Sequence, residues 1–140
     1  MGKGKPSQAS LRRAASTAYY VLFHCLAKSC ADLLLGGDGA DKGQMAWRQT
    51  YRALEHGAAK SACSDGIMSK FPKAIEDFAN AFVTMQEKRH SADYDPLVKL
   101  TKSEVLQDIG LVEQTVRDFM KESKKDRRAF CALVLFKKRK

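Results

Sequence analysis

The stretch from Ser10 to Leu35 contains neither glycine nor proline, and it is apolar on almost every side when wound as a helix. One stripe combines small and apolar side chains: Ala18, Leu22, Cys25, Ser29 and Leu33. Large apolar side chains such as Tyr19 and Phe23 point in other directions. A helix that is apolar all round must be covered on two sides. We therefore expect a long buried helix, capped by Ser10 and ended by Gly36-Gly37, with a second copy of the chain as its simplest second cover.

Three further helices are predicted from apolar positions that recur every three to four residues. The second runs from about Gln44 to Ala62, and the third begins between Ser69 and Pro72. The fourth begins at Thr101, where Thr101-x-x-Glu104 has the form of a capping box. Ala129 to Phe136 is a continuous apolar run that fits either a short fifth helix or an extended arm. The fold class is all-α, an antiparallel up-and-down four-helix bundle formed by residues 1–140 as one domain.

Composition excludes several classes of protein. With 140 residues, 44% hydrophobic and 29% charged, the chain is neither disordered nor collagen-like. Cys25, Cys30, Cys63 and Cys131 contain no CxxC pair, which predicts free thiols. No nucleotide-binding glycine loop, HExxH or paired ExxH motif is present, so we expect no cofactor and no metal. No continuous apolar run of membrane-spanning length and no secretory signal is found, which predicts a cytoplasmic protein without a membrane partner.

The net charge of +9 is concentrated at the two ends. Residues 1–13 carry Lys3, Lys5, Arg12 and Arg13 and no acid, and residues 121–140 carry nine Lys or Arg against two acids. We expect the ends, about 1–9 and 137–140, to be basic and flexible. Such ends can bind phosphate or an acidic partner, or they can serve only as solubilising tails.

Arg89 occupies an unusual position. The stripe of the third helix, Phe78, Phe82 and Met85, places its next inward residue four positions on, at Arg89. A core-facing guanidinium needs a carboxylate, a phosphate or an open cleft, because an unpaired buried charge is costly. Two interpretations stay open. Arg89 pairs with Asp93 or Asp95 and closes the helix, or it binds phosphate beside His90 and Tyr94.

A second polar group lies in the first helix, where Arg13, Thr17, Tyr20 and His24 form one stripe. Polar side chains in line on an otherwise apolar helix indicate a wet groove or an interface with satisfied hydrogen bonds. A histidine in such a stripe is more often a hydrogen-bond partner than a general base. His56, next to Gly57 on the second helix, is predicted to be an ordinary surface or core histidine.

Two segments resemble the HEPN superfamily: Ser16-Thr17-Ala18-Tyr19-Tyr20-Val21-Leu22-Phe23-His24 and Arg89-His90-Ser91-Ala92-Asp93-Tyr94. The resemblance implies an all-helical bundle that pairs into a homodimer. Many HEPN proteins are metal-independent endoribonucleases acting as toxins, phage-defence effectors or RNA-processing factors, with an Arg, a following polar residue and a His at the dimer cleft. Arg89 matches the arginine and His90 the polar position. Tyr94 stands where the histidine is expected, and a tyrosine is a poor base at neutral pH.

Three functional hypotheses follow. In the first, a homodimer binds RNA or a nucleotide through Arg89, with His90, Asp93 and Tyr94 shaping the site and Arg13, Tyr20 and His24 lining it. In the second, the protein is a metal-independent endoribonuclease in which His90 or His24 transfers protons beside Arg89. In the third, the chain is a protein interaction module: Arg89, Asp93 and Tyr94 only tie helix ends, and the basic ends dock on an acidic protein such as an antitoxin. The expected protein partner is an antitoxin or a nucleotidyltransferase.

Overall fold

The structure, a computed structural model, describes residues 5–36 and 43–138 and consists of helices and loops, without strands in this part of the chain. The helices are α1 (Gln8–Leu35), α2 (Gln44–Ala53), α3 (His56–Cys63), α4 (Lys73–Tyr94), α5 (Lys102–Lys121) and α6 (Lys124–Leu135), with the short 3-10 helix η1 (Gly66–Lys70) between α3 and α4. The predicted all-α bundle is confirmed.

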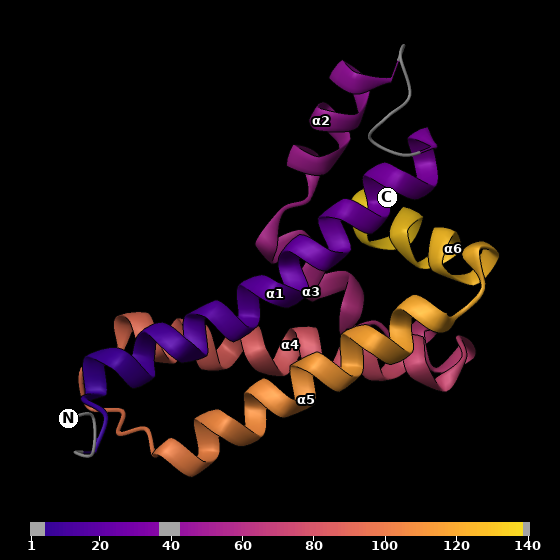
Figure 1. The fold of residues 1–140 in the computed structure, drawn as a ribbon. Helices are drawn as coiled ribbons and strands as arrows, with labels where there is room; N and C mark the ends of the chain where they lie inside the picture. The colour runs from indigo at the N-terminus through magenta and orange to yellow at the C-terminus, as the bar shows by residue number, and fades with distance from the viewer. Residues whose placement is uncertain (1–4, 37–42, 139–140) are drawn as a thin grey trace.

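Helix α1 is the central element and contacts α2, α4, α5 and α6 (Figure 1). Helix α4 runs antiparallel to it and α5 runs parallel to it, because the first turns of α1 lie beside the end of α4 and the start of α5. Helix α2 folds back along the C-terminal half of α1. The chain therefore covers α1 on several sides by itself, and these contacts do not require a second copy. The homodimer stays a prediction.

The core lies where α1, α4, α5 and α6 meet. The inward stripe of α4 is fully buried at Ile75, Phe78, Phe82 and Met85, as the periodicity predicts. Phe78 stacks on Phe119 of α5 with ring centroids 4.3 Å apart, and Phe130 of α6 meets both rings edge-on. Helix α2 contributes no buried side chain, although Leu54 at its end is buried. The core thus belongs to the other helices, and α2 is an appendage of α1.

Several predicted boundaries hold and others are wrong. Thr101 Oγ1 accepts the Glu104 N–H as the capping box requires, and Gly36 ends α1 with a positive φ of 87°. Gly37 and the loop to residue 42 fall outside the described residues. The N-cap of α1 is Ser7, whose hydroxyl accepts from the Ser10 N–H, so the predicted cap at Ser10 is wrong and residues 8 and 9 are helical rather than a flexible end.

The predicted helix over residues 44–62 is two helices. The chain leaves helical geometry at Leu54 (ψ 125°) and Glu55 (ψ 137°), which lets Leu54 enter the core and turns α3 toward α4 and α6. Of the two alternatives left open for the C-terminal run, the helix is observed: α6 begins after Ser123, whose hydroxyl accepts the Asp126 N–H. Burial of Phe130, Cys131 and Val134 explains why this segment is helical and packed.

Three arginines of the basic ends are used inside the fold. Arg12 donates to the carbonyls of Ala92 (2.6 Å), Asp95 (3.0 Å) and Val98 (2.5 Å), and so fastens the end of α4 to α1. Arg127 is buried and donates to the Glu122 carbonyl, and Arg128 donates to the Leu33 carbonyl near the end of α1. Cationic side chains near helix ends satisfy carbonyls that have no partner within the helix. These three charges therefore have a structural role.

Helix α1 is long and apolar enough to cross a membrane by length and composition, which the search for continuous apolar runs did not predict. Its most apolar window has a mean hydropathy of 1.2, and 44% of that window is buried inside the protein. A core helix with partners on several sides has the same pattern. The contacts with four neighbouring helices account for its hydropathy.

Candidate functional site

Arg89 lies on the inward side of α4, as predicted, with only 13% of its side chain exposed. Its guanidinium carbon is 5.1 Å from the ring centre of Tyr19 and 5.6 Å from that of Tyr20, both on α1. Nη1 is 3.5 Å from a carboxylate oxygen of Asp93, the pairing that one interpretation of the sequence anticipated. Its Nε is buried without a hydrogen-bond partner in the described part of the chain. The guanidinium is therefore held mainly by two aromatic rings and one long ion pair.

A row of four rings extends from this arginine along α1 and α2. We call Tyr20, His24, Tyr51 and Trp47 the aromatic row. Neighbouring ring centres are 5.8 Å, 6.0 Å and 5.4 Å apart in that order, with interplanar angles of 29°, 17° and 29°. The antiparallel packing of α1 and α2 creates the row, because residues four apart on each helix share one face.

Polar contacts fix the row at one end and in its middle. Trp47 Nε1 donates to an Asp32 carboxylate oxygen at 2.8 Å, and the Tyr51 hydroxyl is 2.7 Å from His24 Nδ1. Tyr20 lies over the Arg89 guanidinium. The rings are half-buried, except for His24, which is exposed. The arrangement is an offset stack with a fixed cation at one end and accessible ring surface along its length.

Tyr19 and His56 form a second, deeper pair behind the row. The Tyr19 hydroxyl is 2.6 Å from His56 Nδ1, and His56 stacks on Phe23 with ring centres 4.1 Å apart. Burial raises the pKa of Tyr19 well above its ordinary value, against an opposing effect of Arg89. Burial, and then the charges of Arg89 and His24, lower the pKa of His56. Both groups are therefore neutral at neutral pH and share one hydrogen bond at the start of α3.

The structure brings together only part of the predicted site. Arg89, Asp93, Tyr20 and His24 form one connected group. His90 and Tyr94 contact each other with ring centres 4.8 Å apart, and Tyr94 is 67% exposed. Within the described residues this pair has no ring contact or hydrogen bond to the aromatic row or to Arg89.

Arg13 lies on the predicted polar stripe and is exposed. It forms no hydrogen bond or ion pair within the described residues, so its side chain is not fixed to the connected group. Arg13 is one turn before Thr17 and two turns before Tyr20 on α1. It belongs to the same side of the helix without touching the rings.

Sequence reasoning missed three members of the constellation. Trp47 and Tyr51 lie in the predicted second helix but are not among the predicted site residues, and His56 is predicted to be an ordinary surface or core histidine. The available signal was that polar aromatic residues recur four apart on both segments, at Tyr20 and His24 and at Trp47 and Tyr51. Two such pairs on adjacent antiparallel helices can interleave into one stack.

The four cysteines are free, as predicted, and three of them are buried. Burial raises the pKa of Cys25 to about 11 and that of Cys63 to about 12, so neither thiol is an activated nucleophile. No group of three or more His, Cys, Asp or Glu side chains within the described ranges, 5–36 and 43–138, is arranged to hold a metal ion. The chemistry that the site offers is therefore stacking, hydrogen bonding and positive charge. No known family model matches the chain, and no curated protein or solved structure is significantly similar to it.

Proposed function

We propose that the chain is a HEPN-type protein that works as a homodimer and binds single-stranded RNA or a nucleotide through the aromatic row and Arg89. The observation that carries the proposal is the continuous stack of Trp47, Tyr51, His24 and Tyr20 ending at a guanidinium. Proteins that bind single strands combine aromatic stacking platforms with cations that follow the backbone.

The charge around the row supports an anionic ligand. Arg48 and Arg52 are exposed on α2, each one position after a ring of the row, and Arg13 is exposed on the same stripe of α1 as Tyr20. None of these three arginines has an ion pair or hydrogen bond within the described residues. Phosphates of a strand whose bases lie on the rings would pass beside them, and displacement of counterions would make binding weaken with salt.

Arg89 has unused capacity for hydrogen bonds. A guanidinium carries five N–H donors, and within the described residues those of Arg89 are engaged only by Asp93, at 3.5 Å, and by the Tyr19 side chain, while Nε has no partner. A phosphate oxygen competes well for such donors, because Arg–phosphate pairs are charge-assisted and can be bidentate. In the proposal Arg89 anchors one phosphate next to Tyr20. His90 and Tyr94 lie at the periphery of the site.

The test is fluorescence anisotropy of a labelled 12-nucleotide oligo(U) over a salt series. His24→Ala and Tyr51→Ala should each weaken binding roughly 5- to 100-fold, since base stacking on a ring contributes about 1–3 kcal/mol. Arg48→Ala should weaken binding and reduce the salt dependence by about one phosphate contact. Phe136→Ala removes an exposed ring at a different place, on the segment after α6, and is the matched control.

Arg89 is tested separately because it also supports the fold. Arg89→Lys keeps the positive charge but loses the planar, multiply donating group. The proposal predicts weaker oligo(U) binding by this variant while circular dichroism still reports a folded protein. If folded variants of the row and of Arg89 all bind as the unmodified chain does, the proposed site is wrong. Sedimentation equilibrium tests the homodimer independently.

A second candidate, a metal-independent endoribonuclease, is favoured by the position of His24. Its Nδ1 is engaged by Tyr51 at 2.7 Å, its ring is exposed, and Nε2 has no partner within the described residues. An imidazole oriented in this way and stacked on Tyr20, the ring that also contacts Arg89, suits general acid–base transfer. Incubation with total RNA in EDTA tests it: fragments ending in a 2′,3′-cyclic phosphate that disappear with His24→Ala support cleavage. Intact RNA leaves binding as the function.

A further inference from the structure

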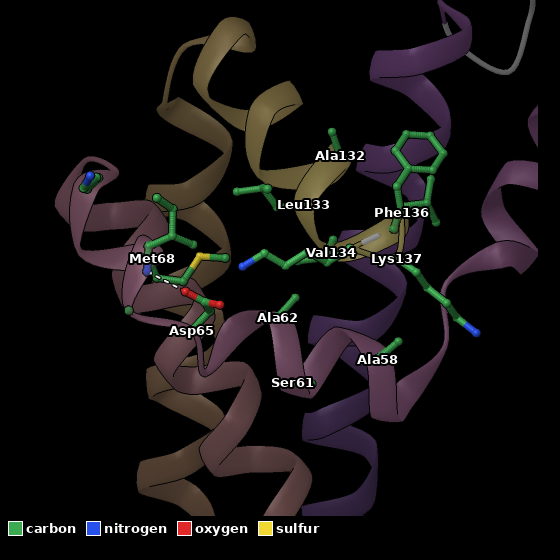
Figure 2. A pocket seen from close by; sticks show the side chains of 15 residues that line it. Ala58, Ser61, Ala62, Asp65, Met68, Ala132, Leu133, Val134, Phe136 and Lys137 are labelled. Carbon is green, nitrogen blue, oxygen red and sulfur yellow. Dashed lines mark hydrogen bonds between the residues drawn. The ribbon is translucent and has the colours of Figure 1, made fainter. Parts of the chain in front are cut away.

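A groove of about 900 Å³ lies away from the aromatic row, between α3 with η1 on one side and the end of α6 on the other. Figure 2 shows Ala58, Ser61 and Ala62 along the α3 wall, with Leu133 and Val134 of α6 facing them. The floor and walls are mostly apolar. Neither RNA binding nor the aromatic row uses this groove.

Large apolar side chains gather around the groove without being covered. Ile67, Leu133 and Phe136 are 38%, 43% and 61% exposed, and all three line it. Exposed apolar side chains that gather around one groove with a charged rim provide a surface on which a partner can dock. The opposite wall is made of alanine and serine side chains, which are short and allow another backbone to approach closely. The shape suits a helix laid into a groove.

The positive charge at the rim of the groove favours an acidic partner. Lys70, Lys137 and Lys138 line the groove, against one carboxylate, Asp65, whose Oδ1 already accepts the Ile67 N–H at 2.9 Å. Lys137 is 3.8 Å from Glu55, but both side chains are largely exposed, so this pair is weak. The rim is therefore positively charged and complements acidic side chains.

We propose that this groove binds an acidic amphipathic helix of a partner protein, with the apolar face of that helix against Leu133, Phe136 and the α3 wall and its carboxylates beside the rim lysines. An α-helix is about 10 Å wide with its side chains, and a groove of about 900 Å³ can take up one face of such a helix. This is an interaction surface separate from the proposed RNA site.

The experiment uses the full chain and a labelled synthetic helix of 18 residues with leucine at i, i+3, i+4 and i+7 and glutamate on the other face, followed by fluorescence anisotropy. Two comparison peptides have the same leucines with lysine in place of glutamate, and the same composition in scrambled order. The acidic amphipathic peptide should bind at least roughly tenfold more tightly than either, because both the apolar face and the charge are matched.

Substitutions in the groove and away from it test where the acidic peptide binds. Ser61→Trp fills the groove from an exposed position without changing the charge, and it should abolish or weaken binding by at least roughly tenfold. Lys70→Glu with Lys138→Glu should weaken it and remove its salt dependence. Leu97→Glu and Lys99→Glu, at exposed positions between α4 and α5, are the matched controls and should leave it unchanged.

Circular dichroism and thermal unfolding establish that each variant is folded, and oligo(U) binding should be unaffected by Ser61→Trp, so failure of the two proposals can be told apart. Three results would overturn this one. The first is equal binding of the acidic amphipathic peptide and the scrambled peptide. The second is a dimer of the chain itself that Ser61→Trp dissociates. The third is saturable binding of sodium dodecanoate that Ser61→Trp removes and with which the acidic peptide does not compete. The second assigns the groove to another copy and the third to a small amphiphile.

Discussion

Two aromatic clusters in this protein have similar ring contacts but differ in burial and in the polarity of their rings. The cluster of Phe78, Phe119 and Phe130 is completely buried and joins α4, α5 and α6. The aromatic row on α1 and α2 is made of Tyr, His and Trp, and its rings are partly open to solvent. Rings without polar atoms can be sealed from water, whereas hydroxyl, imidazole and indole groups need partners and favour a boundary. The comparison teaches that apolar rings form the core here, whereas polar rings lie at its boundary and leave surface open for the proposed ligand.

The largest effect is expected in the buried cluster. Phe119→Ala should lower the free energy of unfolding by about 3–5 kcal/mol, because it removes a fully buried ring and leaves a cavity. Urea denaturation measures this. Leu106→Ala on the same helix, at an exposed position, should change it by less than about 0.5 kcal/mol. A similar loss from both variants would contradict the division between the two clusters.

A smaller change in free energy is expected at the row, and in binding rather than in folding. Trp47→Ala should weaken oligo(U) binding by about 1–3 kcal/mol, since it removes the terminal ring of the stack. Its effect on unfolding should be below that of Phe119→Ala, because α2 contributes no buried side chain to the core. Anisotropy and urea denaturation on the same samples give both numbers. Unchanged affinity with a large loss of stability would assign the row to the core.

Two adjacent tyrosines provide a sharper comparison. Tyr19→Phe removes the 2.6 Å hydrogen bond between the buried Tyr19 hydroxyl and His56 and should cost about 1–2 kcal/mol of stability, because the half-buried imidazole loses its partner. Tyr20→Phe is the matched control, since the Tyr20 hydroxyl has no hydrogen bond within the described residues. Thermal unfolding of the two variants should separate them. Equal melting temperatures would show that the Tyr19–His56 bond contributes nothing.

The smallest effect is a pH dependence. His56 has a pKa below its ordinary value of 6.5 in the folded protein, so as pH falls through this region the unfolded chain takes up a proton first. Stability should therefore decrease on acidification below about pH 6.5, with a slope well below the one-proton limit of about 1.4 kcal/mol per pH unit, because His56 is partly exposed and solvent screens the effect. His56→Gln should flatten that part of the profile, measured by urea denaturation from pH 7.5 to 5. An unchanged slope would contradict the assignment.

The sequence predicted the elements that depend on local periodicity. The stripe of α4, the capping box at Thr101, the stop at Gly36 and the inward position of Arg89 all follow from spacing along one helix. Asp93 lies four residues after Arg89 on the same helix, so spacing also predicted their pairing as one of two alternatives. Patterns within one helix are visible in one sequence because the partners are three or four residues apart.

What could not be predicted depends on partners far along the chain. Arg12 binds carbonyls that lie 80 to 86 residues away, and the Arg128–Leu33 bond spans a separation of 95 residues, so the sequence predicts neither partner. The break at Leu54 has no proline or glycine at the site and arises because the core accepts that side chain. The aromatic row requires the return of α2 along α1, which periodicity on either helix does not specify.

The attachment of the α4–α5 connection to the opening turns of α1 has a consequence for handling the protein. The Gln8 side chain donates to the Leu100 carbonyl and accepts from the Leu100 N–H. Arg12 donates to the carbonyls of Ala92 and Val98, which precede Leu100 in the chain. Removing Gln8 and Arg12 would therefore break these contacts. A truncation beginning after Arg12 would release a connection nearly a hundred residues downstream, so an affinity tag belongs ahead of this point with a cleavage site that spares it.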